Sequence, residues 1–235
     1  MLIIAFESSA RPASVAVLEV CDTSADSCKH KLLGQYFQNN GFSHSRTLMS
    51  MAETLLKSLN LKPADIGLAA VARGPGSFTG IRIGVSAVKG LAWGLDIPVC
   101  GVSTLEAMAR QTRLPGTIIC PVMDARRSQV YNALFKWHGD KLKRLRDDRA
   151  ISIDELSEDL KHYGEPFMFV GDGTEVCKKS ISDNNLHDTP EILHYQTAYG
   201  VALAALHAKP ISSEELEPSY LRPSQAERER NSVNN

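Results

Sequence analysis

The sequence lacks the features that mark secreted, zinc-ribbon and membrane-spanning proteins. Its cysteines are odd in number and form no C-x-x-C pair, which argues against a disulfide framework and fits a reducing cytosol. They are Cys21, Cys28, Cys100, Cys120 and Cys177. No apolar run is long enough to cross a bilayer, and Met1 to Phe6 carries no basic region or cleavage pattern. We therefore expect a cytoplasmic protein with no signal peptide and no membrane span.

The chain also lacks an excess of positive charge. Its 26 Lys and Arg residues face 27 Asp and Glu residues, for a formal net charge of −1. A protein that binds RNA on its own usually carries a basic excess. Any RNA contact is therefore expected to be local or to come from another subunit. The 235 residues, 43% of them hydrophobic, are enough for one large or two small lobes.

Patterns for metal, nucleophilic and disulfide chemistry are missing as well. No two of the 7 histidines are four positions apart, so there is no helical H-x-x-x-H ligand pair. His187 and His194 lie near two acids in a loop-like stretch, where a polar surface is a better explanation than a metal site. No G-x-S-x-G elbow accompanies a credible Ser/His/Asp set, and no cysteine has an activating neighbourhood.

What the sequence does contain is one order of elements that occurs twice. In the first half, apolar alternation predicts strands over 2–6, 14–20, 32–38, 68–72 and 98–102, with helices over 43–59 and from about 81 to 95. In the second half the predicted strands are 117–123, 129–137, 141–149 and 167–170, with a helix over 152–163 that Ser152 and Glu155 cap. A further helix is predicted over 195–208, and residues 21–31 are expected to form an extended loop tip.

This repetition predicts an α/β fold of the actin-like, Hsp70-like and sugar-kinase-like type, with two lobes that each hold a mixed sheet flanked by helices. Residues 1–100 plus about 195–222 would form the first lobe, and residues 101–194 a second, reduced lobe. The charged, apolar-poor tail 226–235 is predicted to be disordered. A plain open α/β sheet would give a similar string of elements and stays open as the alternative.

The most distinctive segment is the glycine-rich stretch from Gly74 to Gly84, which follows a strand and opens a helix. The free N–H groups of such a helix start could hold an anion. The segment lacks the lysine of a P-loop, and it follows the fourth strand, whereas a dinucleotide fingerprint normally follows the first. The alternative is that the glycines only let the helix pack closely.

Two acidic turns are weak candidates for nucleotide binding. The first holds Glu7, Ser8 and Ser9, where actin-like proteins bind nucleotide phosphate and metal, and Asp124 is at the equivalent turn of the second unit. Glu7 is longer than the usual Asp and would shift a metal site, so a solvated acidic turn is the favoured interpretation. Asp124 has the better side chain, although Arg126 and Arg127 could simply pair with it.

Four stretches of the chain resemble the TsaB (YeaZ) family. They are Ala72-Arg-Gly-Pro-Gly-Ser-Phe-Thr-Gly-Ile-Arg-Ile-Gly84, Gly101-Val-Ser-Thr-Leu105, Asp124-Ala-Arg-Arg-Ser-Gln-Val-Tyr131 and Glu217-Pro-Ser-Tyr-Leu-Arg222. They follow the family's order over most of the chain. Glu7, in place of the commoner Asp, and the segment 21–31 depart from the family pattern.

The resemblance implies an actin-like duplicated fold and a cytoplasmic complex with the catalytic paralogue TsaD and the ATPase TsaE. That complex transfers threonylcarbamoyl from its adenylate to the N6 of the adenosine beside the anticodon, in tRNAs reading codons that start with A. The family's H-x-x-x-H metal site belongs to TsaD, which implies a non-catalytic scaffold or activator role here and only indirect contact with tRNA. Peptidase activity, an old label for some relatives, has no supporting residues. No cofactor is expected to bind tightly, and ATP or ADP only at a site shared with the complex.

Two helices are predicted to form the partner surface. The helix after Gly80 is apolar or small around nearly its whole circumference, and the helix from Ser43 carries Met49 and Leu56 beside its core stripe. We expect these faces to pair in a homodimer and with TsaD, unless both helices are covered within their own lobe. The expected interface residues are Met49, Ala52, Leu56, Gly84, Ala87, Val88 and Leu91.

Two other functions remain open at this point. One is an actin-like nucleotide-hydrolysing enzyme or small-molecule kinase that uses Glu7 and Asp124 around a metal. The other is a free-standing nucleotide-binding regulator, which would need tight ligand binding without TsaD. A titration with magnesium-ATP separates both from the partner role.

Overall fold

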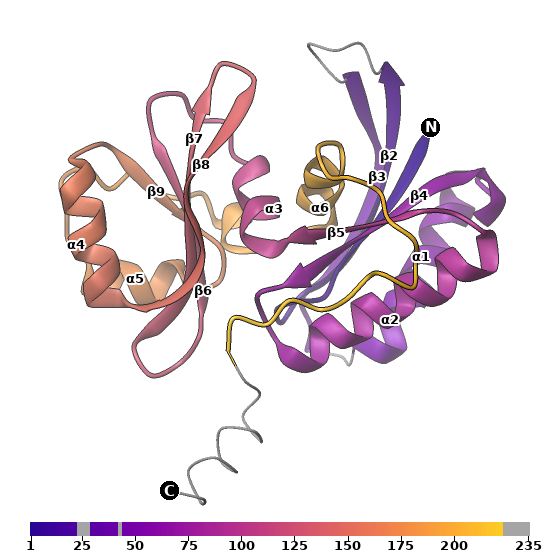
Figure 1. Cartoon of the computed structure of the whole chain (residues 1–235), viewed down its shortest axis with the longest axis horizontal. Coiled ribbons are helices and arrows are strands. Elements are labelled where there is room, and N and C mark those ends of the chain that lie inside the picture. Colours follow the sequence, from indigo (N-terminus) through magenta and orange to yellow (C-terminus); the bar gives the residue numbers. More distant parts are fainter. Residues whose placement is uncertain (23–28, 42–43, 223–235) are drawn as a thin grey trace, which may run out of the picture.

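The structure, a computed structural model, describes residues 1–22, 29–41 and 44–222. Two mixed sheets lie side by side, with helices on their outer faces and between them (Figure 1). The predicted α/β class is confirmed.

The first sheet has the strand order β3-β2-β1-β4-β5. β1 pairs with β2 in antiparallel and with β4 in parallel orientation. Alternate residues of β1 enter two different cores: Phe6 points to one face of the sheet and Ala5 to the other, and both are fully buried. The strands are β1 (Leu2–Glu7), β2 (Ala13–Asp22), β3 (Lys29–Gln38), β4 (Ile66–Gly74) and β5 (Val99–Ser103).

Three helices cover this sheet. α1 (His44–Ser58) and α2 (Phe78–Leu95) pack on the face that bears Phe6, and the short 3-10 helix η1 (Pro63–Asp65) precedes β4. α6 (Ala198–Ala205) packs on the opposite face, although it follows the second sheet in the chain (Figure 1). This helix begins later than predicted because Thr197 caps it by accepting a hydrogen bond from the backbone of Gly200, and it ends at Ala205.

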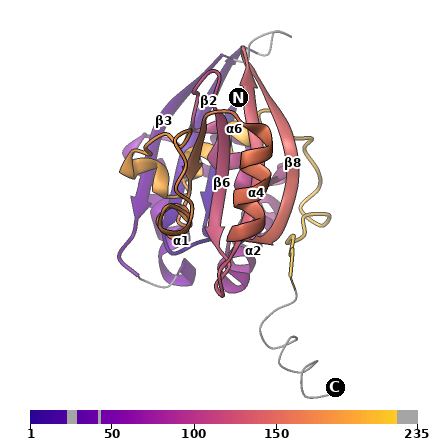
Figure 2. The same cartoon turned by 90° about the vertical axis from the view of Figure 1, so that its left-hand side faces the viewer.

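The second sheet repeats the plan with one strand fewer, in the order β8-β7-β6-β9. β6 pairs with β7 in antiparallel and with β9 in parallel orientation. α4 covers the outer face of this sheet together with α5, and Figure 2 shows α4 in front of the strands. Ser152 and Glu155 form the predicted capping box at the start of α4. The elements are β6 (Ile118–Asp124), β7 (Gln129–His138), β8 (Lys141–Ser152), α4 (Ile153–Tyr163), β9 (Phe167–Val170), α5 (Thr174–Ser180) and the 3-10 helix η2 (Glu191–His194).

Helix α3 (Thr104–Arg110), which the sequence pattern did not predict, fills the junction between the sheets beside α6 (Figure 1). Its residues Leu105 and Met108 pack on the inner face of the second sheet, and Ala107 packs against the first-sheet core. The two sheets are therefore joined through a continuous apolar layer.

The bounds predicted for the loop tip, residues 21–31, are wrong at both ends. β2 extends to Asp22 and β3 begins at Lys29, so Cys21 and residues 29–31 belong to paired strands. The part 23–28 and the tail 226–235 predicted to be disordered lie outside the described residues. Among the helices that are described, none combines the length and the apolar character needed to cross a bilayer.

Candidate functional site at the junction of the two sheets

Glu7, at the end of β1, is buried and not the solvated acid that we favoured from the sequence. Only 1% of its surface is exposed. Its Oε1 accepts a hydrogen bond from the backbone N–H of Ser9 at 2.6 Å, while Oε2 has no partner among the described residues. Burial raises the pKa of Glu7 to about 7; hydrogen bonding from Ser9 opposes this rise, and the negative charge of Asp172 adds to it.

Asp172 lies in the turn after β9, and sequence reasoning missed it. Its Oδ1 accepts a hydrogen bond from Nε2 of Gln196 at 2.7 Å. The residue is exposed, whereas burial of its carboxylate raises its pKa to about 6; the bond from Gln196 opposes the rise, and the charge of Asp124 adds to it. The signal that could have found Asp172 is its place between Gly171 and Gly173, directly after a strand.

Asp124 ends β6 and organises the turn that follows it. Its Oδ1 accepts the backbone N–H of Arg126 at 2.7 Å. Asp124 makes no ion pair with Arg126 or Arg127 within the part of the chain that the structure describes. The alternative that these arginines neutralise Asp124 is therefore wrong.

The negative charge of Asp172 raises the pKa of Glu7, and the negative charge of Asp124 raises the pKa of Asp172, so the three acids belong to the same junction. Like charges in such proximity favour protonation of one member. No group of three His, Cys, Asp or Glu residues with metal-binding geometry occurs in residues 1–22, 29–41 and 44–222. The three acids are therefore neighbours without forming a ligand cluster.

The glycine-rich turn packs against the turn that holds Ser8 and Ser9. A Cβ on Gly76 would lie 2.4 Å from the carbonyl oxygen of Ser9, and one on Gly80 would lie 2.0 Å from that of Ser8. The N–H of Ser77 donates to the same Ser9 carbonyl at 2.6 Å. Close packing therefore explains these glycines, and protein backbone fills the space in front of them.

The segment 211–222, here called the C-terminal strap, runs along α2 and then crosses to the second sheet (Figure 1). Ile211 pairs with Val99 at the free edge of β5, and Leu216 is buried in the core under α2. The N–H of Ser219 donates to the carbonyl of Arg73 at 2.7 Å. At the far end, the guanidinium of Arg222 donates to Gln129 on β7. The strap therefore ties the two sheets together.

Three of the stretches that resemble TsaB meet at this strap. Tyr220 stacks on Phe78, with ring centroids 4.7 Å apart, and its hydroxyl accepts a hydrogen bond from Arg82 at 2.9 Å. The guanidinium of Arg222 lies 5.9 Å from the ring centroid of Tyr131. Segments from three distant parts of the chain thus form one surface.

Several of the predicted interface residues face their own core instead of a partner. The exposed fraction is 3% for Ala52, 6% for Leu56 and 0% for Val88, and Gly84 is also buried. These residues pack between the helices and the first sheet, so the assignment of Leu56 to a position beside the core is wrong. Met49 is 43% exposed, and Ala87 and Leu91 are partly exposed. Trp93 on α2, which the sequence pattern did not single out, is 79% exposed.

Sequence comparison places this chain among known relatives. A family model described as TsaD, tRNA N6-adenosine threonylcarbamoyltransferase, matches residues 39–229. The tRNA threonylcarbamoyladenosine biosynthesis protein TsaB of Bacillus subtilis (strain 168) is 34% identical over 183 residues, which cover 78% of this chain and 76% of that protein. TsaB of Escherichia coli (strain K12) is 27% identical over 215 residues, covering 81% and 91%.

Solved structures agree on the fold. YeaZ from Pseudomonas aeruginosa superposes with a TM-score of 0.74 at 20% identity, covering 94% of this chain and 99% of that chain. A second Pseudomonas aeruginosa structure, described as similar to peptidase YEAZ, gives a TM-score of 0.76 at 21% identity with the same coverage. The fold is thus the predicted actin-like one, and with these relatives the chain belongs to the TsaB (YeaZ) family.

Proposed function

We propose that this chain is a non-catalytic subunit of the assembly that transfers threonylcarbamoyl to the N6 of the adenosine beside the anticodon, in tRNAs reading codons that start with A. Two kinds of similarity support this. The Bacillus subtilis and Escherichia coli relatives are named as tRNA threonylcarbamoyladenosine biosynthesis proteins. The match to the transferase model extends over residues 39–229, so the chain is built like the transferase itself.

The observation that carries the non-catalytic role is the contact between the two turns at the junction. The backbone of Ser8 and Ser9 occupies the space in front of Gly76 and Gly80, where a phosphate would have to approach the start of α2. Two of the N–H groups at this helix start are already used: Ser77 donates to the Ser9 carbonyl, and Gly80 donates to the Ser77 hydroxyl. A bound ATP or ADP would therefore need a site shared with another subunit.

The proposed partners are TsaD and TsaE in the cytoplasm, with a homodimer when the chain is alone. The exposed side of α1 and α2 supports a partner surface, because large exposed apolar side chains are typical of interface cores. Trp93 is 79% exposed and Met49 43% exposed. A Cβ on Gly90 or Gly94 would meet nothing within 4 Å, which leaves open space beside Trp93.

The variant Met49→Glu with Trp93→Glu tests this surface. Both side chains lie outside the cores, so we expect a folded protein, and the new carboxylates would be buried without partners in any interface formed there. Size-exclusion chromatography with light scattering should show a monomer that no longer binds TsaD. Ile192→Glu, at a 68% exposed apolar residue on η2, is the matched control and should leave both associations intact. Unchanged dimerisation and TsaD binding in the double variant would move the interface elsewhere.

An actin-like nucleotide-hydrolysing enzyme or kinase is the second candidate, because Glu7, Asp172 and Asp124 converge at the junction. Calorimetric titration of the purified chain with magnesium-ATP separates the two. We expect no measurable binding and no ATP hydrolysis. Magnesium-dependent ATPase activity that disappears in Asp124→Ala would overturn the non-catalytic assignment.

Reconstitution tests the proposed function itself. TsaD, TsaE, the threonylcarbamoyl adenylate and an unmodified tRNA transcript are incubated with and without this chain, and the modified nucleoside is quantified by mass spectrometry. We expect no modification by this chain alone and none by the other components without it. Full turnover in its absence would contradict the proposal.

A further inference from the structure

Four arginines on one side of the molecule make no ion pair among the described residues. Arg126 and Arg127 are exposed on the turn between β6 and β7, Arg82 is exposed on α2, and Arg222 is half-buried at the end of the strap. We call the surface that carries these four residues the strap face. The guanidinium of Arg82 lies 3.9 Å from the ring centroid of Phe78, and Arg222 donates to the side-chain amide of Gln129. Asp124 is the acid beside the β6–β7 turn, where it accepts the backbone N–H of Arg126 and forms no ion pair with its guanidinium in the described chain.

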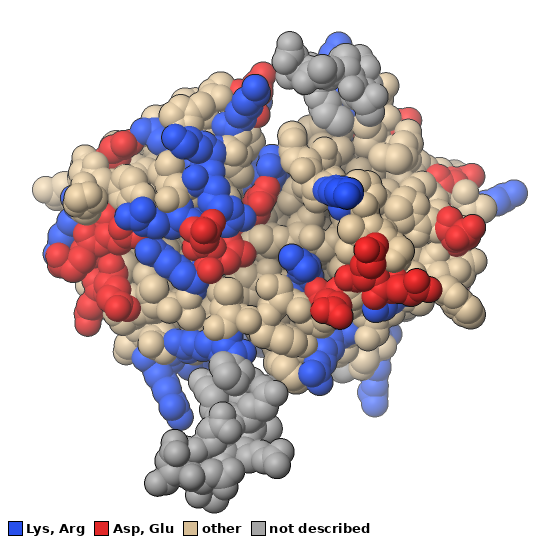
Figure 3. Space-filling model, in the orientation of Figure 1, with Lys and Arg blue, Asp and Glu red and all other residues tan. Residues whose placement is uncertain are grey.

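The strap face is continuous across both sheets. The ring of Tyr220 lies between the α2 end and Arg222, and the ring of Tyr131 lies beside Arg222 at the second sheet. In Figure 3 blue side chains lie at the lower edge of the molecule, where Figure 1 has the β6–β7 turn. The acids of the strap, Glu214, Glu215 and Glu217, precede this part and form no ion pair with it in the described chain.

The turn that carries Arg126 and Arg127 has an unusual backbone. Arg126, Arg127 and Ser128 have φ values of 63°, 56° and 56°, a left-handed region that residues other than glycine rarely adopt and that costs conformational energy. The bond from the Arg126 N–H to Asp124 and the bond from the Gln129 N–H to the Arg126 carbonyl hold it. The side chains of both arginines remain exposed. Such cost at a surface turn is typical of a functional constraint.

Uncompensated guanidinium groups beside aromatic rings are the chemistry that binds single-stranded RNA, where arginine contacts phosphates and rings stack on bases. We propose that the strap face binds the phosphodiester backbone of RNA directly, so that this subunit itself holds part of the tRNA. The choice of tRNA rests on the proposed function. The formal net charge of −1 fits a contact confined to one face.

Arg126→Asn with Arg127→Asn tests this inference. Asparagine tolerates the left-handed conformation, so the variant removes two charges and keeps the turn. The control, Lys141→Gln with Lys143→Gln, removes two exposed charges from β8 on the other part of the second sheet. Binding of a fluorescent, unmodified tRNA transcript is measured by anisotropy from about 50 to 200 mM salt, for the chain alone and with TsaD.

We expect the arginine variant to bind the transcript about tenfold more weakly, with a log–log salt slope smaller by about 1 to 2. The control should remain within about twofold of the parent chain. The inference would be overturned if the parent chain and the arginine variant bound the transcript equally. It would also be overturned if adding this chain did not increase the affinity of TsaD for tRNA. Loss of TsaD association with unchanged tRNA affinity would also overturn it, in favour of an acidic protein surface. The reconstitution with and without this chain tests the proposed function separately, because its outcome does not depend on which subunit contacts RNA.

Discussion

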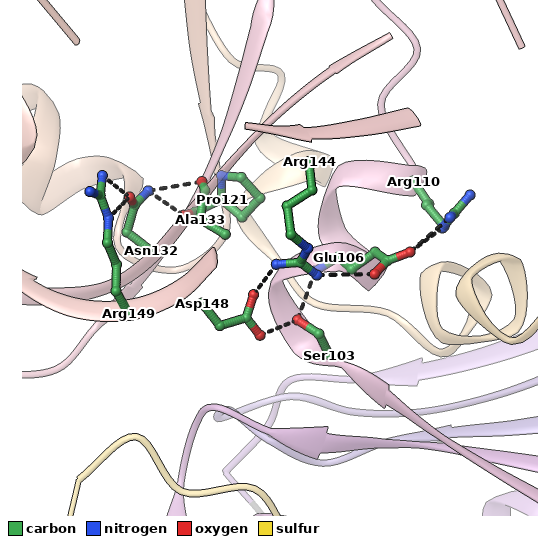
Figure 4. Close-up of polar contacts among 9 residues, drawn as sticks. All are labelled: Ser103, Glu106, Arg110, Pro121, Asn132, Ala133, Arg144, Asp148 and Arg149. Atoms are coloured by element: carbon green, nitrogen blue, oxygen red, sulfur yellow. Dashed lines mark hydrogen bonds and ion pairs between the residues drawn. The ribbon is translucent and has the colours of Figure 1, made fainter. Parts of the chain in front are cut away.

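Two groups of arginines in this protein differ in how their charge is balanced. On α3 and β8 every arginine pairs with a carboxylate: Glu106 bonds to Arg110 and Arg144, and Asp159 bonds to Arg146 and Arg149. Figure 4 shows Arg144 held between Glu106 and Asp148. The strap-face arginines have no such partners in the described chain. Charge on α3 and β8 therefore serves the fold, whereas charge on the strap face is left for another molecule.

The buried polar residues of the second sheet also bond to one another. Asn132 is fully buried on β7, and its Oδ1 accepts two hydrogen bonds from Arg149, at 3.2 and 3.0 Å, while its amide nitrogen donates to the carbonyls of Pro121 and Ala133 (Figure 4). Every member of this network is satisfied by another member. A closed network contributes to stability and offers little to a ligand.

The largest effect is expected for Arg149→Met. This change leaves the buried Asn132 oxygen without a donor and takes the 2.5 Å ion-pair partner from Asp159. We expect the free energy of unfolding to fall by about 3 kcal/mol, measured by urea denaturation. Arg146→Met is the matched control: it pairs with the same carboxylate but is 42% exposed, so a loss below about 1 kcal/mol is expected. Equal losses of unfolding free energy in the two variants would show that the buried hydrogen bonds of Arg149 add nothing beyond an exposed ion pair.

Glu7→Gln has the next largest expected effect, because Glu7 is the acid that is buried without a basic partner. Its pKa rises from the ordinary 4.5 to about 7 on folding, so its contribution to stability is fully present below about pH 4.5 and is lost as pH rises through about 7. The parent chain should therefore lose about 2 kcal/mol more than Glu7→Gln between about pH 5 and 8. Parallel stability profiles for the two proteins would show that Glu7 does not titrate in this range.

The smallest effect on stability is expected for Arg126→Asn with Arg127→Asn. Both guanidinium groups are exposed and neither pairs with an acid in the described residues. We expect a change within about 0.5 kcal/mol, measured by the same denaturation experiment. A loss comparable to that of Arg149→Met would mean that the strap-face charges also serve the fold.

Periodicity predicted most of the fold because the repeated unit is locally encoded. The alternation in β1 separates Phe6 from Ala5, and the Ser152 capping box marks the start of α4. Helix α3 was not predicted because its 7 residues are too few to show a helical repeat. It also packs against both sheets, so its apolar residues do not lie on one face. Leu56 was misplaced because α1 packs against α2 as well as against the sheet, so its buried face is wider than the core stripe suggests.

The site was less accessible from sequence because it depends on contacts between distant segments. Glu7 has polar neighbours in the sequence, yet it is buried where the glycine-rich turn packs against Ser8 and Ser9. Likewise Arg144 and Glu106 are 38 residues apart, and no local pattern distinguishes Arg144 from Arg126. Which arginines pair with acids could therefore be determined only from the folded structure.

The rate of threonylcarbamoyl transfer as a function of tRNA concentration tests the central claim most directly. The complete mixture of TsaD, TsaE and adenylate is assayed with the parent chain, with Arg126→Asn/Arg127→Asn, and with Lys141→Gln/Lys143→Gln. We expect a KM for tRNA that is about tenfold higher with the arginine variant, at a kcat within about twofold of the parent, and no change with the lysine control. Identical KM values for all three chains would contradict it.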